Sequence, residues 1–275
     1  MQWWQALVLG FTQGLTEFLP VSSSGHLTFL QKLMGVDTGA ELFFDLVLHM
    51  GTLIAVCAIF WRDILGLFRK PFKTLLYLVV ATIPAAIVGL LLDDIIEDNI
   101  MGGAYTGVYL AVFFFLTACV LLAAEIFAKR RKSIYPLGWR TALPMGFAQA
   151  VAVLPGISRS GSTIAAGTFA GGSAEDVSKF SFLLSIPVIL GGFAVSLLKG
   201  IIDKDNGFAH SFEVAGSQFG WCIAIGFIVS TIAGLFAIKV MLAAIKKANY
   251  KWFSAYLVAL SITCIVLHCC GVFGT

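Results

Sequence analysis

Residues 13–26 read QGLTEFLPVSSSGH, and residues 155–163 read PGISRSGST. Each run interrupts an apolar stretch, 3–33 in the first case and 141–171 in the second, with proline, glycine and serines that disrupt a helix. The half-segments on either side are too short to cross a bilayer easily, since crossing takes about 20 apolar residues. Broken backbone at membrane depth is tolerated only where protein or a water-filled cavity satisfies it. Both segments are therefore predicted to be re-entrant helical hairpins whose tips reach inward.

The rest of the chain is predicted to consist of membrane-spanning helices. Hydrophobic residues make up 59% of the 275 residues and charged residues 12%, against about 45–50% and about 25% in soluble domains. A bilayer accommodates this balance because apolar side chains can face lipid. The expected fold is an all-α polytopic membrane protein, a single membrane domain over residues 1–275 with six transmembrane helices and the two re-entrant hairpins. The predicted spans are 40–60, 73–92, 104–128, 175–199, 218–241 and 250–271.

Basic residues give the expected orientation in the membrane. Fourteen of the 18 Lys and Arg residues fall on one side of the predicted spans, in the segments 62–73, 129–140 and 239–251 and at Lys179. The other side carries the acidic segment 93–98. Because cytoplasmic loops carry the excess of Lys and Arg, the basic side is predicted to be cytoplasmic, and the first hairpin to enter from outside. The net charge of +3 does not indicate a nucleic-acid partner.

The two broken segments resemble each other. Residues 10–13 (GFTQ) are echoed by residues 146–149 (GFAQ), and the Leu-Pro pair at 19–20 by the pair at 154–155, with one-residue offsets around the proline. Three predicted spans follow each hairpin, so an odd number of crossings inverts the second copy relative to the first. Inverted repeats place a binding site near the midplane, where discontinuous helices meet, so both tips are predicted to share one cavity. The expected copies are residues 1–128 and 140–275.

The first hairpin supplies a carboxylate, hydroxyls and an imidazole. Glu17 lies in an apolar helix, where a charge costs at least ~2.5–3.5 kcal/mol on insertion scales, so a functional role is favoured over an interfacial carboxylate. Gln13 lies one turn earlier on the same face. Free amides at a helix start suit phosphate oxygens, and serine is a nucleophile where a base is near. The alternatives are helix capping for any one serine and a non-catalytic polar role for the histidine. The residues that open the next helix are Ser22, Ser23, Ser24 and His26.

The second hairpin supplies a cation. Arg159 is the only basic residue at a break, and a guanidinium fork beside helix-start amides is suited to clamping phosphate. The alternative, a snorkelling interfacial arginine, is disfavoured by the predicted place at the tip. Asp45 and His49 share a face of the first predicted span and are interpreted as supporting or interfacial groups. The small and hydroxyl residues around the arginine are Gly156, Ser158, Ser160 and Thr163.

A carboxylate, hydroxyls, an imidazole and an arginine in one membrane cavity suit phosphoryl transfer from a lipid-linked phosphate. Glu17 is then expected to help hold a divalent cation, Mg²⁺ or Ca²⁺, on the phosphates. The sequence contains no pattern typical of an all-protein metal cage, which favours a cation bound together with the substrate.

The two runs quoted at the start resemble the two signatures of the bacitracin-resistance family of undecaprenyl-diphosphate phosphatases, and the resemblance extends over essentially the whole chain. The family's first signature takes Glu or Gln at the position of Gln13, so this chain has the single-carboxylate version. The resemblance implies hydrolysis of undecaprenyl diphosphate to undecaprenyl phosphate and inorganic phosphate at the outer face of the bacterial plasma membrane. That reaction recycles the lipid carrier for peptidoglycan synthesis and confers bacitracin resistance.

The resemblance also implies roles for individual residues. Glu17 is expected to be the essential carboxylate, handling a metal or a proton, and Ser23 to be the nucleophile. His26 is expected to assist catalysis and Arg159 to clamp the diphosphate. The expected partners are the polyprenyl diphosphate and membrane lipids, and a homodimer is left open. The expected substrate-binding residues are Gln13, Ser22, Ser24, Gly156, Ser158, Ser160 and Thr163.

A transporter is the competing class. Inverted repeats with broken helices are a transporter design, so flipping of a lipid phosphate is an alternative to hydrolysis. A purely structural membrane scaffold leaves Glu17 and Arg159 unexplained.

Overall fold

The computed structural model describes residues 1–36, 38–96, 100, 103, 105–130, 135–202, 219–245 and 250–273. Within these residues all regular structure is helical, and an isolated bridge pairs Tyr135 with Gly172. Parts of the acidic segment 93–98 and of the basic segments 129–140 and 239–251 lie outside the described residues. The helices are α1 (Trp3–Phe18), α2 (Ser23–Met34), α3 (Thr38–Ile59), α4 (Trp61–Leu67), α5 (Lys73–Ile95), α6 (Thr106–Arg130), α7 (Trp139–Val151), α8 (Arg159–Phe169), α9 (Ala174–Ile202), α11 (Phe219–Ile245) and α12 (Lys251–Cys269).

The described helices confirm an all-α membrane fold. Five of them, α5, α6, α9, α11 and α12, are long and apolar enough to cross a membrane, and α3 with α4 forms a sixth candidate that is bent by 81°. Large apolar side chains such as Leu91, Trp221 and Phe236 lie exposed on the outside. Such side chains are stable there because they face lipid tails rather than water. The bounds of α3, α5, α6, α9, α11 and α12 agree with the six predicted spans to within a few residues.

The helices end at both predicted breaks. At the first break, residues 19–22, α1 stops before Pro20, and Ser22 adopts a positive φ of 69° and caps α2 by accepting a hydrogen bond from the Gly25 N–H at 3.4 Å. At the second break, residues 152–158, Gly156 has a φ of 100°, which glycine adopts without a Cβ penalty. Ser158 then caps α8. The sequence therefore forms two helix pairs, α1 with α2 and α7 with α8.

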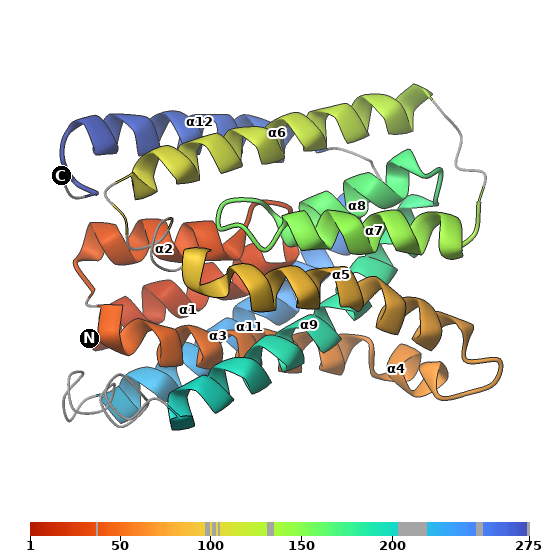
Figure 1. The fold of residues 1–275 in the computed structure, drawn as a ribbon, viewed down its shortest axis with the longest axis horizontal. Coiled ribbons are helices and arrows are strands. Elements are labelled where there is room, and N and C mark those ends of the chain that lie inside the picture. The colour runs from red at the N-terminus through yellow and green to blue at the C-terminus, as the bar shows by residue number, and fades with distance from the viewer. Residues whose placement is uncertain are drawn as a thin grey trace.

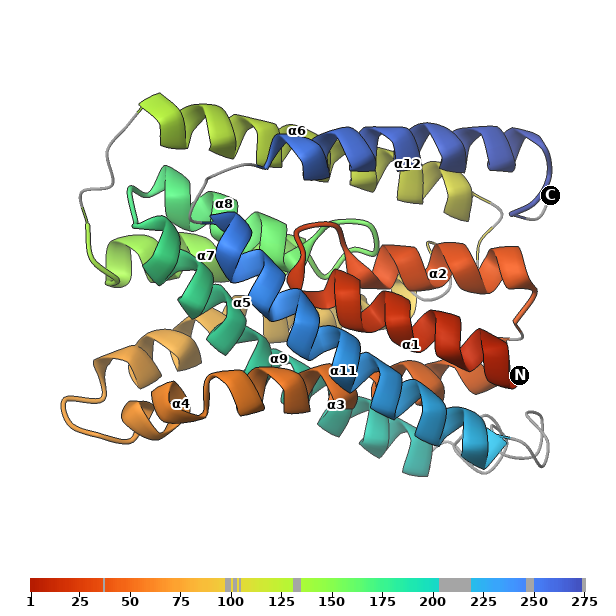
Figure 2. The same cartoon turned by 180° about the vertical axis from the view of Figure 1, so that it is seen from behind.

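The two helix pairs approach each other end to end. In Figure 1 and Figure 2, α1 and α2 extend from the end of the molecule that holds the N-terminus, α7 and α8 extend from the opposite end, and the two breaks meet in the middle. α1 packs along α11, and α7 packs along α5. Both packings are tight: a Cβ on Gly10 would lie 2.8 Å from the Gly226 carbonyl oxygen, and one on Gly146 would lie 2.7 Å from that of Ala81. The long helices thereby hold both breaks in place.

Candidate active site

A cavity of about 420 Å³ lies where the two breaks meet. Its polar wall comes from the two helix pairs, and its apolar wall comes mainly from α5 and α9. The polar side chains on the wall are Thr16, Glu17, Ser22, Ser23, Ser24, His49, Thr82, Gln149, Ser158, Arg159 and Ser160. The arrangement combines a hydrophilic pocket with an apolar surface, as the headgroup and the tail of a lipid require.

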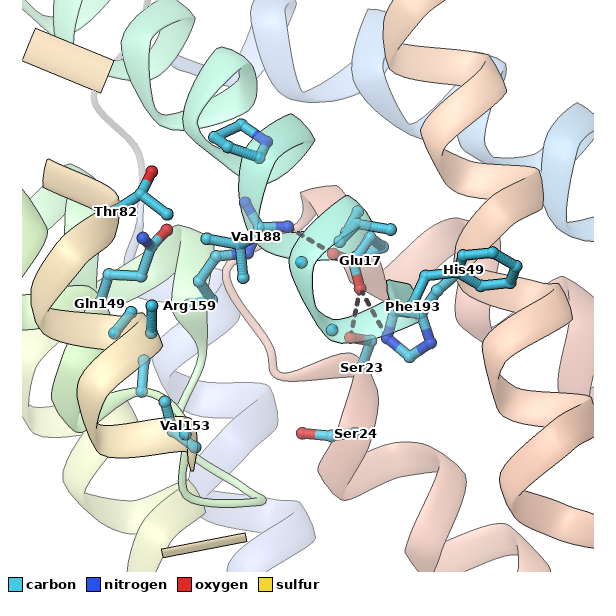
Figure 3. Close-up of a pocket in the computed structure, with 18 of the residues that line it drawn as sticks. Glu17, Ser23, Ser24, His49, Thr82, Gln149, Val153, Arg159, Val188 and Phe193 are labelled. Atoms are coloured by element: carbon cyan, nitrogen blue, oxygen red, sulfur yellow. Dashed lines mark hydrogen bonds and ion pairs between the residues drawn. The ribbon is translucent and has the colours of Figure 1, made fainter. Parts of the chain in front are cut away.

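Glu17 is the centre of the polar wall. Its side chain is only 5% exposed. The Ser23 hydroxyl donates to Glu17 Oε2 at 2.6 Å, and Gln13 Nε2 donates to the same oxygen at 3.1 Å. The other oxygen, Oε1, accepts a hydrogen bond from Arg159 Nη2 and forms an ion pair with it (Figure 3). A buried carboxylate is stable only when it is paired and hydrogen-bonded in this way, and the pairing joins the first break to the second.

Arg159 is the first residue of α8 and lies 13% exposed at the cavity. Besides the pair with Glu17, its Nη1 donates to the Ser181 carbonyl oxygen at 3.4 Å. A guanidinium has five N–H donors, so the described contacts leave further donors for an anion in the cavity. Thr163 buttresses the backbone of Arg159, because its hydroxyl lies 2.8 Å from the Arg159 carbonyl oxygen and 2.6 Å from Ser181 Oγ.

A histidine from α3 also reaches Glu17. His49 Nε2 lies 3.8 Å from Glu17 Oε2, the oxygen that Ser23 contacts (Figure 3). The other ring nitrogen, Nδ1, lies 2.8 Å from the Asp45 carbonyl oxygen. That contact assigns the proton of the neutral ring to Nδ1 and leaves the Nε2 lone pair facing the carboxylate and the hydroxyl. Among the described side chains, His49 is therefore the imidazole placed to exchange a proton in the cavity.

His26 is not part of the lining of this cavity. Its Nδ1 is 2.7 Å from the Ser22 carbonyl oxygen, and its Nε2 is 2.7 Å from the hydroxyl of Tyr256 in α12, on which the ring also stacks. The ring borders a smaller cavity on the other side of the first break. Among the described residues, the hydrogen bonds and ring contacts of His26 do not involve Ser23 or Glu17. They fix the turn at Ser22 instead, and a catalytic role for His26 stays a prediction.

Ser22 and Ser160 connect the two breaks. The Ser22 hydroxyl oxygen accepts a hydrogen bond from the Gly156 N–H at 3.1 Å, and Ser160 Oγ donates to the Leu19 carbonyl oxygen at 2.9 Å. The backbones also approach closely, since a Cβ on Gly25 would lie 2.8 Å from the Gly156 Cα. These contacts keep Glu17 and Arg159 in register.

The predicted substrate-binding residues fall into two groups. Ser22, Ser24, Ser158 and Ser160 line the cavity, as do the predicted catalytic residues Glu17, Ser23 and Arg159. Gln13, Gly156 and Thr163 are not part of the lining; each instead bonds to a residue that is. Their contribution in the structure is to position the lining side chains.

Gln149 on α7 is a lining residue that the motifs did not single out. It is 2% exposed, and neither polar atom of its amide has a hydrogen-bond partner among the described residues. The signal in the sequence was the repeat, in which Gln149 occupies the place of Gln13.

The oxygen atoms that line the cavity fit a divalent cation only if the cation is shared with a bound substrate. Within the described ranges, no group of three or more His, Cys, Asp or Glu side chains could hold a metal. The cavity offers one carboxylate, Glu17, beside serine hydroxyls. Mg²⁺ is commonly bound through one or two carboxylates together with substrate phosphates, and the single carboxylate matches that pattern.

Residues 6–263 match the family model described as bacitracin resistance protein BacA. The undecaprenyl-diphosphatase of Carboxydothermus hydrogenoformans is 40% identical over 274 residues, which cover 99% of this chain and 100% of that protein. The undecaprenyl-diphosphatase of Methanobrevibacter smithii is 38% identical over 92% of each chain. That of Corynebacterium efficiens is 38% identical over 97% of this chain and 91% of its own.

Proposed function

The chain belongs to the bacitracin resistance protein BacA family, and on that premise we propose that it is an undecaprenyl-diphosphatase. It hydrolyses undecaprenyl diphosphate to undecaprenyl phosphate and inorganic phosphate, which recycles the lipid carrier for peptidoglycan synthesis and confers bacitracin resistance. The observation that carries the proposal is the position of Ser23 and Arg159 on opposite oxygens of Glu17. A hydroxyl, its base and a phosphate clamp thus meet in a cavity with an apolar wall.

In the proposed reaction, the diphosphate enters the cavity and engages the free N–H donors of Arg159 through bidentate, charge-assisted hydrogen bonds. The Ser23 oxygen attacks the distal phosphorus while its proton passes to Glu17 Oε2, 2.6 Å away. The bond from that phosphorus to the bridging oxygen breaks, and undecaprenyl phosphate leaves with the electron pair. Charge that develops on the transferred phosphoryl group is stabilised by the guanidinium.

Water completes the reaction. It attacks the phosphorylated serine, and the Nε2 lone pair of His49, which faces the same carboxylate oxygen, takes up the proton of the water. The Ser23 oxygen departs with the proton held by Glu17, and inorganic phosphate is released. General acid–base help of this kind contributes about 10²–10⁴-fold to a rate.

A divalent cation, Mg²⁺ or Ca²⁺, fits the proposed site when it is shared with the diphosphate. Glu17 would hold it, and it would neutralise phosphate charge.

The two helix pairs are proposed to be re-entrant hairpins in an inverted repeat, residues 1–128 and 140–275. In support, the packing is exchanged between the halves: α1 of the first half lies on α11 of the second, and α7 of the second lies on α5 of the first. Gly10 and Gly146, which match in the sequence repeat, lie at close helix contacts in both cases. Among the described helices, each half also has a broken pair followed by three long helices, and the first half adds the short α4.

The protein is proposed to lie in the bacterial plasma membrane, surrounded by lipids, with the cavity open to the outer face. α4, the end of α6 and the start of α7 carry basic residues and lie together at the end of the molecule opposite the N- and C-termini (Figure 1). α5 and α9 both begin near that end. The residues of these helices that line the cavity, 82–90 and 187–196, lie in the halves remote from it. The cavity therefore extends away from the side that the positive-inside rule assigns to the cytoplasm.

Phosphate release by the purified protein in detergent tests the proposed function. We expect inorganic phosphate from undecaprenyl diphosphate, and none from the Glu17→Gln variant, which keeps the side-chain shape and loses the base. Flipping of a lipid phosphate requires two sealed compartments. A protein that moved lipid phosphate across sealed vesicles but released no phosphate in detergent would be a transporter, and the proposed activity would be wrong.

A further inference from the structure

Gln149 is a buried polar side chain in the cavity wall that the proposed reaction does not use. It lies on α7, 2% exposed, and neither Oε1 nor Nε2 of its amide meets a hydrogen-bond partner among the described residues. Burying an amide without partners is destabilising. A residue that weakens the fold in this way, at the edge of a cavity, is typical of a group whose partner is a ligand.

Gln13 and Gln149 occupy matching positions in the sequence repeat, but their amides differ in their hydrogen bonds. Gln13, the counterpart of Gln149, donates its amide N–H to Glu17, four residues later on the same helix face. Four residues after Gln149 stands Val153, which has no polar atom to accept that bond. The first amide is occupied with holding the catalytic carboxylate, whereas the second lines the cavity with its donors uncommitted.

The position of Gln149 in the cavity indicates which of the two substrate phosphates it contacts. In Figure 3, Arg159 lies between Gln149 and Glu17, so the amide is on the side of the guanidinium away from Ser23. The distal phosphorus must lie beside Ser23 to be attacked. Thr82, which also lines the cavity, donates its hydroxyl hydrogen to the Leu78 carbonyl oxygen at 2.7 Å. Gln149 therefore offers an uncommitted neutral N–H donor at this end of the cavity.

We propose that Gln149 binds the phosphate that stays on the lipid. In this arrangement its Nε2 donates to a nonbridging oxygen of the proximal phosphate, and Arg159 binds between the two phosphates. This inference rests on the proposed function and adds to it a subsite for the phosphate monoester product. An amide suits that role because it donates a hydrogen bond without adding a second positive charge that would retain the product.

The test compares Gln149→Met with the wild-type enzyme. Methionine keeps the length of the side chain and removes both polar atoms. We expect the KM for undecaprenyl diphosphate to rise about tenfold and inhibition by undecaprenyl phosphate to weaken by a similar factor, the equivalent of one lost hydrogen bond to a charged group. Inhibition by inorganic phosphate and kcat should change less than about threefold. The midpoint of thermal unfolding should stay the same or rise, because an unsatisfied amide has been removed.

A structural role for Gln149 would give the opposite result. Thermal stability would then fall along with activity, and inhibition by undecaprenyl phosphate would be unchanged; either result overturns the proposal. Gln149→Glu, of the same shape but without the donor, is the second variant, with the same expectation for product inhibition or a larger loss. Gln13→Met is the contrast, since it should lower kcat by disturbing Glu17. If the wild-type protein released no phosphate, the proposed function would fail, whereas a subsite for lipid phosphate would still appear as weaker binding of undecaprenyl phosphate to Gln149→Met.

Discussion

Glu17 and Arg159, 142 residues apart in the chain, form a buried ion pair between the ends of two broken helices. Neither residue is stable alone at this depth, because an isolated charge in an apolar environment is costly. Each therefore depends on the other break for its partner. Because a guanidinium has five N–H donors, the group that joins the two breaks can, in the proposed reaction, also bind a phosphate oxygen.

Arg159→Lys should lower kcat/KM by about tenfold or more. Lysine keeps the positive charge but loses the planar fork that binds Glu17 and a phosphate oxygen at once. The measurement is initial rates of phosphate release over a range of undecaprenyl diphosphate concentrations. Arg62→Lys is the matched control, because Arg62 lies over the ring of the exposed Trp61 and is not part of the cavity lining. Near-normal turnover by the Arg159 variant would show that the fork does not engage phosphate.

Ser22→Ala should destabilise the protein more than Ser24→Ala. The Ser22 hydroxyl oxygen accepts hydrogen bonds from the N–H groups of Gly25 and Gly156, and alanine leaves both donors buried and less satisfied. Unsatisfied buried groups cost about 1–3 kcal/mol each. Thermal unfolding in one detergent compares the two variants. Equal midpoints would mean that the bond between the two breaks contributes little to stability.

Gly89→Leu should weaken binding of the lipid without unfolding the protein. Gly89 lies on the apolar cavity wall, and a Cβ there would meet nothing within 4 Å, so leucine fills space rather than clashing. We expect the KM for undecaprenyl diphosphate to rise several-fold, because the cavity is narrowed. Gly66→Leu is the control, since Gly66 is also helical and open but lies outside the lining. An unchanged KM for the Gly89 variant would place the lipid tail elsewhere.

Two exposed positions test the orientation. Tyr105 precedes α6 at the end remote from the basic residues, and Arg140 opens α7 at the basic end. In a cysteine-free background, Tyr105→Cys should react with an impermeant thiol reagent on intact cells, and Arg140→Cys only after permeabilisation. The reverse pattern would place the cavity on the cytoplasmic side.

The breaks and spans were predictable because their signals are local. Pro20 and the serines after it end one helix and cap the next, and the apolar stretches are as long as a bilayer is thick. The meeting of the two breaks, which hold Glu17 and Arg159, was predicted from the sequence repeat, because inverted copies would bring their tips together. The bend of 81° between α3 and α4 was not predicted, because no proline or glycine marks residue 60.

The contacts that the two histidines make could not be predicted from the sequence. Ser23 and His26 are three residues apart at a helix start, a spacing that predicts a shared face. The positive φ of Ser22 and the packing of α12 instead place His26 against Tyr256, 230 residues away. His49 approaches the carboxylate only because α3 packs beside α1. Neither contact leaves a pattern along the chain.

His49→Gln tests whether His49 accepts the proton of the attacking water. Glutamine is similar in size to histidine but has no titratable ring. We expect kcat to fall about 10²-fold, as for the loss of a general base, and His26→Gln to affect mainly thermal stability. Adding His49→Gln to Ser23→Ala should cost little more than Ser23→Ala alone, because residues that act as a unit give non-additive losses. If the rate losses of the two single variants multiplied in the double variant, Ser23 and His49 would act independently of each other.

The most direct test of the catalytic centre is the rate of phosphate release from undecaprenyl diphosphate by purified Ser23→Ala, measured beside Ser24→Ala. Both serines line the cavity at the start of α2, but only Ser23 has a hydroxyl bonded to Glu17. We expect Ser23→Ala to be nearly inactive and Ser24→Ala to keep substantial activity. Turnover by Ser23→Ala at close to the wild-type rate would contradict this expectation, and direct attack by water would replace the serine.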